Sequence, residues 1–221
     1  MRAGFGSSFS VEKSHAMQLQ LSKRVVCEDC LPEAIRYVAG VDVAYSGENS
    51  IGAVAVLDFA SLSTVEFEVA RVKTSYPYVP TLLSFREISP AVSAIQKLEV
   101  RPDVFLIDGQ GIAHPYRLGF ASHLGLMINK PTIGVAKSLL CGEVQPFNGQ
   151  RLAPIIDHGE TIGMAVITVP GKKPLYVSIG HQVSLERSVQ VVAHCVRGYR
   201  IPEPIGRAHM AANAEKKLQT K

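Results

Sequence analysis

The pattern of hydrophobic and polar positions divides the chain into two parts. The first part predicts a meander of three strands, at residues 36–45, 51–59 and 63–71. The segment 46–50 reads as a hairpin turn between the first two strands. In the third strand, hydrophobic Val65, Phe67 and Val69 alternate with two glutamates, so one of its faces should meet water.

In the second part, strands alternate with helices. Segment 117–127 is a predicted helix, and the strands are expected at residues 104–108, 132–136, 161–169 and 174–179. The first two of these strands, with the helix between them, are typical of a parallel strand–helix–strand unit.

Four further helices are predicted. Near the N-terminus, Met17, Leu21 and Val25 recur every four residues, which predicts an amphipathic helix from about residue 11 to 26. The pair Ser89-Pro90 is a typical helix start, and Ser184 is a typical N-cap for a long helix. A short helix should follow near the C-terminus.

These elements predict an α/β fold with a mixed sheet of five to six strands and helices on both faces. We expect residues 1–221 to form one domain, with the Gly- and Ser-rich residues 1–10 frayed. In open α/β sheets, functional sites form beyond the carboxyl ends of the strands, so residues at those ends are the first candidates for a site.

Composition changes this picture little. The chain has 221 residues, 47% hydrophobic and 19% charged, with a net charge of +4, which tolerates a polyanionic partner without requiring one. No apolar run is long enough for a membrane span or a signal peptide, so we expect a cytoplasmic protein. Cys27 and Cys30 form a single C-x₂-C pair, whereas a zinc ribbon needs two.

Three carboxylates stand in unusual positions. Asp42 interrupts an apolar strand, Asp108 ends the apolar run 104–107, and Glu87 closes a segment rich in Tyr and Pro. A lone buried carboxylate is costly to desolvate, so several that converge predict a divalent cation, with Mg²⁺ or Mn²⁺ favoured by hard oxygen ligands. The small neighbours of Asp42 on its strand face, Gly40 and Ala44, should leave room for metal and substrate.

The segment 108–125 is dense in candidate binding residues. Gly109 and Gly111 allow the backbone to approach a ligand and to offer N–H groups to it. His114 and His123 follow, and each has packing as an alternative role. Lys137 comes directly after a predicted strand and can neutralise charge on a phosphate. Its alternative role is that of a solvated surface lysine.

Tyr78 lies between Pro77 and Pro80, with Val79 beside it. Proline stiffens such a loop, so the tyrosine is a candidate for a rigid wedge that enters a base stack. The alternative is a turn in which Tyr78 packs on the core. His209 has the weakest local case, because a single histidine near a terminus has many ordinary explanations.

Taken together, these segments resemble the endonuclease V family of deaminated-base repair nucleases. The matching motifs run in family order and are VDVAY at 41–45, PYVP at 77–80, LLSFRE at 82–87, the segment 108–125, GVAK at 134–137, SIGH at 178–181, SLE at 184–186, PEP at 202–204 and Ala208-His209.

This resemblance implies an RNase H-like fold and the roles of the site residues. Asp42, Glu87, Asp108 and His209 would form the metal and catalytic cluster, with Mg²⁺ on Asp42 and Asp108 and Mn²⁺ as a substitute. Lys137 would contact phosphate. Tyr78 would fill the gap left by the flipped base, and the remaining substrate-binding residues would be Pro77, Val79, Pro80, Gly109, Gly111 and His114.

The implied reaction is a nick at the second phosphodiester bond 3′ to a deaminated base, chiefly hypoxanthine, in DNA. The sequence departs from the family pattern at three places. Thr81 stands where Gly usually follows the wedge, Tyr116 where Arg follows His-Pro, and Ile205-Gly206 where Thr-Arg precedes the histidine.

Three alternative functions remain open. The first is an RNase H-like nuclease for inosine-containing RNA or branched DNA, which would not need the wedge. The second is a nucleic-acid-binding module without catalysis, and the third is a sugar or phosphotransfer enzyme of related fold. We expect a monomer whose partner is DNA that contains deaminated bases, with inosine-containing RNA as the alternative partner. No membrane partner is expected.

Overall fold

A computed structural model of the chain describes residues 10–218, so most of the segment expected to be frayed, 1–10, lies outside the described residues. Its strands are β1 (Tyr37–Ser46), β2 (Asn49–Asp58), β3 (Thr64–Lys73), β4 (Val104–Ile107), β5 (Thr132–Ala136), β6 (Glu143–Val144), β7 (Leu152–Asp157), β8 (Glu160–Val166) and β9 (Leu175–His181). Its helices are α1 (Val11–Ser22), α2 (Leu83–Ile95), α3 (Phe120–Ile128), α4 (Leu185–His194) and α5 (Glu203–Leu218).

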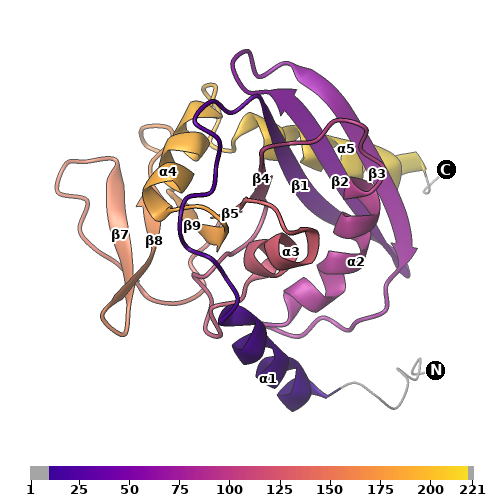
Figure 1. The fold of residues 1–221 in the computed structure, drawn as a ribbon, viewed down its shortest axis with the longest axis horizontal. Coiled ribbons are helices and arrows are strands. Elements are labelled where there is room, and N and C mark those ends of the chain that lie inside the picture. Colours follow the sequence, from indigo (N-terminus) through magenta and orange to yellow (C-terminus); the bar gives the residue numbers. More distant parts are fainter. Residues whose placement is uncertain (1–9, 219–221) are drawn as a thin grey trace.

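The strands form one mixed sheet in the order β3-β2-β1-β4-β5-β9-β8-β7-β6 (Figure 1). Strands β1, β4 and β5 run parallel in its centre, and the other pairs are antiparallel. The sheet therefore has nine strands, and the expectation of five to six was wrong. Seven of the nine strands correspond to segments predicted as strands; β6 and β7 were missed because β6 has only two residues and β7 contains Pro154, which interrupts a strand pattern.

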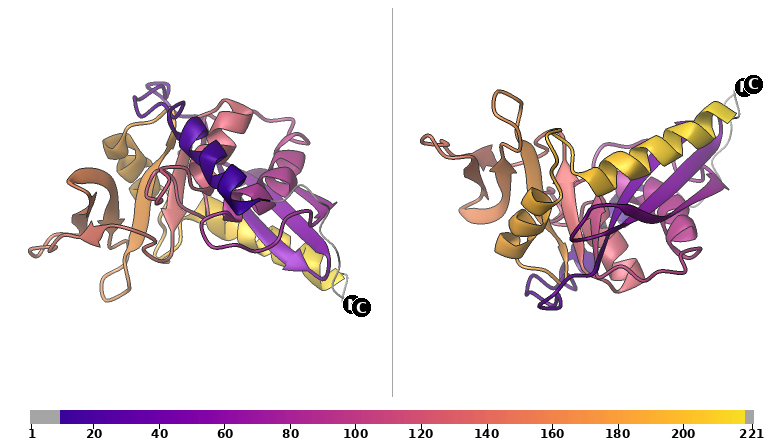
Figure 2. Two further views of the ribbon diagram at one scale, coloured as in Figure 1. Left: turned by 90° about the horizontal axis from the view of Figure 1, so that it is seen from below. Right: turned by 90° about the horizontal axis from the view of Figure 1, so that it is seen from above.

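Helices cover both faces of the sheet, as predicted. Figure 2 shows α5 along one face, with α2 and α3 on the opposite face. Alternate residues of β1 explain this arrangement: Val38 joins the hydrophobic cluster that contains Ile205 of α5, whereas Ala39 and Val41 join the cluster that contains Ala91 of α2. Because β1 is apolar on both faces, it can be buried between the two helical layers.

The N-terminal helix differs from its prediction. It ends at Ser22, and Met17 of the expected apolar stripe is 49% exposed, whereas the polar residues Ser14 and Gln18 are buried. The helix packs through these polar side chains because they find hydrogen-bond partners on the loops beneath it, including the carbonyl oxygens of Thr81 and Leu118. The period-four pattern identified a helix but not the face that it buries.

Helix α2 also begins earlier than predicted. Ser89-Pro90 lies inside it rather than at its start, because the helix begins at Leu83. The Pro90 carbonyl packs against Gly52 of β2, where a Cβ would lie only 2.1 Å from that oxygen. This close contact and the burial of Ala91 and Ala94 offset the hydrogen bond that proline cannot make. By contrast, Ser184 caps α4 as predicted, since its Oγ accepts a hydrogen bond from the Arg187 N–H.

Among residues 10–218, no helix is both long and apolar enough to cross a membrane.

Candidate active site and lesion pocket

Asp42 and Asp108 lie side by side on neighbouring parallel strands. Val41 of β1 pairs with Ile107 of β4, and the Asp108 N–H donates to the Val41 carbonyl over 3.0 Å. Because side chains alternate along a strand, both carboxylates project toward the face that α5 covers. The sequence expectation that Asp42 would come from a strand next to Asp108 is confirmed.

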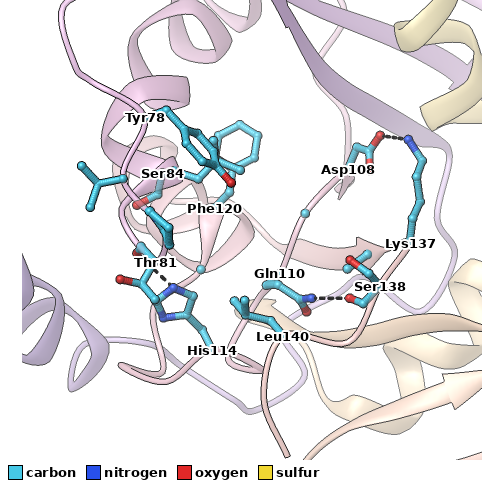
Figure 3. Close-up of a pocket in the computed structure, with 16 residues that line it drawn as sticks. Tyr78, Thr81, Ser84, Asp108, Gln110, His114, Phe120, Lys137, Ser138 and Leu140 are labelled. Atoms are coloured by element: carbon cyan, nitrogen blue, oxygen red, sulfur yellow. Dashed lines mark hydrogen bonds and ion pairs between the residues drawn. The ribbon is translucent and has the colours of Figure 1, made fainter.

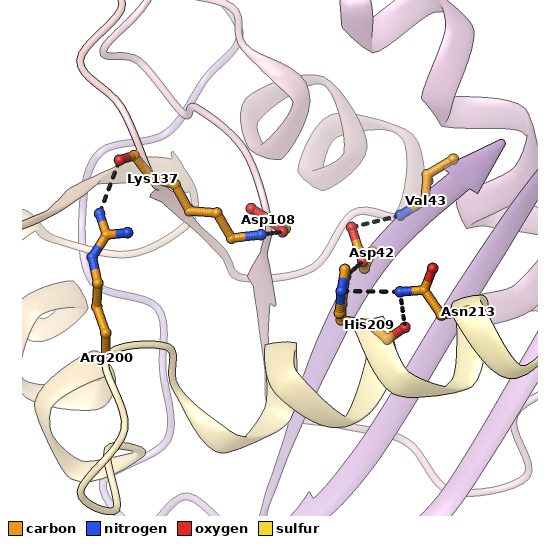
Figure 4. Close-up of polar contacts among 7 residues, drawn as sticks. All are labelled: Asp42, Val43, Asp108, Lys137, Arg200, His209 and Asn213. Atoms are coloured by element: carbon orange, nitrogen blue, oxygen red, sulfur yellow. Dashed lines mark hydrogen bonds and ion pairs between the residues drawn. The ribbon is translucent and has the colours of Figure 1, made fainter.

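Each of these carboxylates has a cationic or histidine partner (Figure 4). The Lys137 ammonium group forms an ion pair with Asp108. His209 Nδ1 lies 2.7 Å from Asp42 Oδ2, while the Asn213 amide donates to His209 Nε2 over 2.9 Å. Since Nε2 accepts that bond, the Nδ1 proton points at Asp42.

Gly40 explains why His209 can reach Asp42. A Cβ at Gly40 would lie 2.0 Å from the carbonyl carbon and oxygen of Pro204, so the first turn of α5 rests directly on the backbone of β1. The space beside Asp42 that the small residues were expected to leave for metal and substrate is therefore taken up, at Gly40, by α5. The glycine instead serves to bring the helix, and with it His209, against the strand.

Glu87 reaches the site from the opposite helical layer. It lies in α2, is buried, and accepts a hydrogen bond from the Tyr45 hydroxyl over 2.9 Å. The pKa of Glu87 is raised to about 8, chiefly by burial; the Tyr45 hydrogen bond lowers the pKa, whereas the negative charges of Asp42 and Asp108 contribute to the rise. The three predicted carboxylates thus influence one another electrostatically.

Asp108 shows the same influence. Burial raises the pKa of its carboxyl group, and the charge of Asp42 adds to that rise, whereas the bond to Lys137 lowers the pKa. A divalent cation between Asp42 and Asp108 would favour the charged form of the buried Asp108 and would offset the repulsion between the two carboxylates. This pair is therefore suited to binding such a cation. Oxygen ligands without thiolate suit Mg²⁺, which commonly uses one or two carboxylates and completes its shell with water.

Within residues 10–218, no three His, Cys, Asp or Glu side chains are arranged closely enough to hold a metal ion among themselves. The two-carboxylate site of Asp42 and Asp108 is compatible with this finding, since it needs no third protein ligand. Cys27 and Cys30 are exposed free thiols and lie outside this site.

A cavity of about 350 Å³ includes Asp108 in its lining, whereas Asp42 and Glu87 do not line it (Figure 3). One wall carries Asp108 and Lys137, and another carries Tyr78, Val79, Pro80 and Thr81; its other lining residues are Leu83, Ser84, Gly109, Gln110, His114, Gly119, Phe120, Ala136, Ser138 and Leu140. Tyr78 is 69% exposed, as expected of a projecting aromatic. The cavity therefore brings together most of the predicted substrate-binding residues, although Pro77 and Gly111 do not line it.

Gly111 supports the fold instead of facing the cavity. Its N–H donates to Ser178 Oγ over 2.9 Å, and a Cβ there would lie 2.0 Å from the Ile179 carbonyl oxygen. The amide of Gly109 is also bonded, to the Ile107 carbonyl. The N–H groups that the glycines were expected to offer to a ligand are thus already used within the chain.

The two candidate histidines of this segment are buried and neutral near pH 7. Burial lowers the pKa of His114 to about 4 and that of His123 to about 4. His114 Nε2 donates to the Thr81 carbonyl, and its Nδ1 accepts from the Tyr116 N–H. His123 Nδ1 lies 3.1 Å from the Ser84 hydroxyl. Both side chains therefore fix loops and helices around the cavity.

Sequence reasoning missed Tyr45 and Asn213 as members of the site. Tyr45 lies three residues after Asp42, on the strand face that meets α2 and Glu87, so strand alternation alone could have placed it there. Asn213 lies one helical turn beyond His209, at the spacing at which side chains of a helix meet.

A pH-dependent stability is expected from Glu87. Between pH 4.5 and about 8 the folded protein keeps the Glu87 proton that the unfolded chain has lost, so the free energy of unfolding falls as pH rises through this window. In EDTA, the melting temperature should therefore drop between pH 5.5 and 8.5 by several degrees more for wild type than for Glu87→Gln; about 2–4 °C corresponds to each kcal/mol in a chain of this size.

Glu48→Gln is a matched control, because the Glu48 side chain is exposed. Its melting curve should follow wild type across the same pH range. If the Glu87→Gln and wild-type melting temperatures changed in parallel, the raised pKa of Glu87 would be wrong.

Solved structures share this architecture. Endonuclease V from Streptomyces avermitilis has a TM-score of 0.90 and 36% identity, with 100% of this chain and 98% of that one covered. Endonuclease V from Ciona intestinalis, solved in complex with a 24mer DNA containing an inosine followed by a ribo-adenosine, has a TM-score of 0.87 and 34% identity and covers 94% of this chain and 98% of its own.

Sequence relatives agree with the structures. Endonuclease V of Thermofilum pendens is 47% identical over 208 residues, which are 94% of this chain and 89% of that protein. Endonuclease V of Nostoc punctiforme is 44% identical over 210 residues, covering 93% and 95%. The family model of Endonuclease V matches residues 19–210. On this combined likeness of sequence and structure, the chain belongs to the endonuclease V family.

Proposed function

We propose that this protein is a Mg²⁺-dependent DNA repair endonuclease that recognises deaminated bases, chiefly hypoxanthine, and nicks the second phosphodiester bond on their 3′ side. Membership of the endonuclease V family makes the chain a nuclease acting on DNA. We infer its lesion, its metal ion and its cleavage position. The related protein of Ciona intestinalis, bound to inosine-containing DNA, supports the choice of lesion.

One observation carries this proposal: a single cavity joins Asp108, one of the two carboxylates proposed to hold the metal, to the loop that carries Tyr78. A nuclease that extrudes a base must place the base in a pocket while the backbone of the same strand lies at the hydrolytic residues. The cavity has Asp108 and Lys137 at one side and the exposed Tyr78 at another, which suits a nucleotide held between them.

Asp42 and Asp108 are the residues that would hold Mg²⁺, and when bound the ion would supply Lewis acidity and lower the pKa of water. Lys137 would move from its carboxylate partner to a phosphate oxygen and neutralise charge there. His209, held by Asn213 with its Nδ1 proton directed at Asp42, would orient that carboxylate. Glu87, held by the Tyr45 hydroxyl, would orient the attacking water.

Tyr78 would occupy the gap left in the duplex by the extruded base. Its exposed position in a loop stiffened by two prolines suits a side chain that enters a base stack. Inosine in a mismatch loses less pairing on extrusion than a normal base does, and this difference contributes selectivity.

The test is a nicking assay on duplexes that differ at one base: hypoxanthine, uracil or no lesion, each in Mg²⁺, Mn²⁺ or EDTA. We expect a metal-dependent nick at the second phosphodiester bond 3′ to hypoxanthine, mapped on a denaturing gel. An inosine-containing RNA strand, and a DNA strand with a ribonucleotide after inosine, test the alternative RNA substrate. Equal cutting of the undamaged duplex, or cutting in EDTA, would overturn the proposal.

A further inference from the structure

Thr81 has a backbone conformation that its side chain disfavours. Its φ is +72°, in the left-handed region where β-branched residues are genuine outliers. This residue lies three positions after Tyr78 and lines the cavity. A strained residue of this kind persists only where the contacts around it hold it in place.

Three side chains hold Thr81. Its carbonyl oxygen accepts hydrogen bonds from Gln18 Nε2 over 2.7 Å and from His114 Nε2 over 3.1 Å, the latter visible in Figure 3. Its hydroxyl oxygen lies 2.9 Å from His15 Nε2. Two of these three partners, His15 and Gln18, come from α1, which thereby holds the loop from outside the sheet.

His15 also holds the second loop at the cavity. Its ring stacks on Tyr116, with centroids 4.2 Å apart and planes 17° from parallel, and its Nδ1 lies 3.1 Å from the Tyr116 hydroxyl. Tyr116 in turn donates its backbone N–H to His114 Nδ1. One side chain of α1 therefore bridges the loop that carries Tyr78 and the loop that follows Asp108.

His15 thus has two partners in the loops at the cavity, Thr81 and Tyr116. Glycine enters the left-handed region without strain, so it needs no contacts to hold it there. Threonine is strained in that region and does need such contacts. The strained conformation of Thr81 and the contacts of His15 are therefore connected.

We propose that His15 is a positioning residue for lesion recognition: together with Gln18 it holds Thr81 in its strained conformation and so fixes the loop that presents Tyr78 to the substrate. This role rests on the proposed function, since it assumes that Tyr78 and the cavity receive the damaged nucleotide. His15 does not touch the carboxylate site, so it acts on substrate binding and not on hydrolysis.

A double-mutant cycle tests this role, with His15→Ala, Thr81→Gly and the double variant. Single-turnover nicking of a hypoxanthine duplex, measured against enzyme concentration, separates the half-saturating concentration from the rate at saturation. In the wild-type background, which has Thr81, His15→Ala should raise the half-saturating enzyme concentration about tenfold or more. The reason is that a smaller fraction of molecules would have the Tyr78 loop in its binding-competent conformation. The saturated rate should change less than about threefold.

In the Thr81→Gly background the same His15→Ala change should raise the half-saturating concentration less than about threefold, because glycine needs no brace. His15→Phe, which keeps a ring on Tyr116 but loses both hydrogen bonds, provides a second test if the alanine variant folds poorly. Met17→Ala is the matched control on α1, since Met17 is 49% exposed, and it should behave as wild type.

Equal effects of His15→Ala in the two backgrounds, or a fall confined to the saturated rate, would overturn the role of His15 and leave the proposed function intact. A wild-type protein that does not nick hypoxanthine duplexes would overturn the proposed function, and the role of His15 with it. The two failures are therefore distinguishable from the wild-type lane alone.

Discussion

Replacing Asp42 with alanine should reduce nicking of a hypoxanthine duplex by roughly 10³-fold or more while leaving lesion binding within a few fold. The reason is that Asp42 is one of only two carboxylates proposed to hold Mg²⁺, whose charge stabilisation of a phosphoryl transition state is worth several kcal/mol at about 1.4 kcal/mol per tenfold in rate. Single-turnover nicking and fluorescence anisotropy of a labelled duplex measure the two effects separately.

Asp42→Asn is the matched variant, because it keeps the shape of the side chain and a partner for His209 but removes the negative charge. It should lose nicking nearly as fully as the alanine variant. Cutting at the wild-type rate by either variant in Mg²⁺ would show that the metal assignment is wrong.

Gly40→Ala should both destabilise the protein and impair nicking, because the new Cβ would meet the Pro204 backbone at 2.0 Å. The first turn of α5 cannot yield as a flexible side chain would, so the helix must move off β1. Overpacking of this kind costs about 1–3 kcal/mol. Displacement of His209 from Asp42 should lower nicking about tenfold, measured together with the melting temperature.

Gly206→Ala is a control on the same helix. A Cβ at Gly206 would meet nothing within 4 Å, and alanine favours helix by about 0.5–1 kcal/mol over glycine. This variant should melt slightly higher than wild type and nick normally. A Gly40→Ala protein as stable and active as the Gly206→Ala protein would mean that α5 does not rest on β1 in this way.

The sequence predicted the centre of the fold well because periodicity is strongest there. The apolar runs before Asp42 and Asp108 identified β1 and β4, and strand-end logic placed their carboxylates together, as the pairing of Val41 with Ile107 confirms. Glu87 was a candidate from its place at the end of a segment rich in Tyr and Pro, and the motifs of the endonuclease V family assigned it to the same cluster.

Which face of a strand or helix is buried was harder to predict than where the element lies in the sequence. In β3 the hydrophobic face is the exposed one: Phe67 is 63% exposed, whereas Glu66 is half-buried and accepts hydrogen bonds from the Glu99 and Val100 N–H groups. Period-two alternation assigns polar residues to water, but here the loop that follows α2 supplies N–H donors that only the tertiary structure brings near Glu66. The buried polar side of α1 has the same cause.

Other features of the site depend on partners remote in the chain. Nothing local distinguishes His15 from an ordinary helical histidine, because Thr81 and Tyr116 meet it only after folding. Glu87 likewise gains its raised pKa from burial and from charges on other elements. Long-range contacts and pKa shifts of this kind arise only in the folded structure, and no periodic pattern in the sequence indicates them.

The attachment of α1 has a consequence for how the molecule responds to its surroundings. The hydrophobic clusters of residues 10–218 include no residue of Val11–Ser22, and this helix is held by hydrogen bonds from Ser14, His15 and Gln18 and by the stacking of His15 on Tyr116. Water can replace such bonds at small net cost, whereas it cannot replace apolar packing. Mild denaturant should therefore release α1 while the sheet stays folded. If α1 positions the loop of Tyr78 as proposed, its release should reduce selectivity between damaged and normal bases before it reduces the rate of hydrolysis.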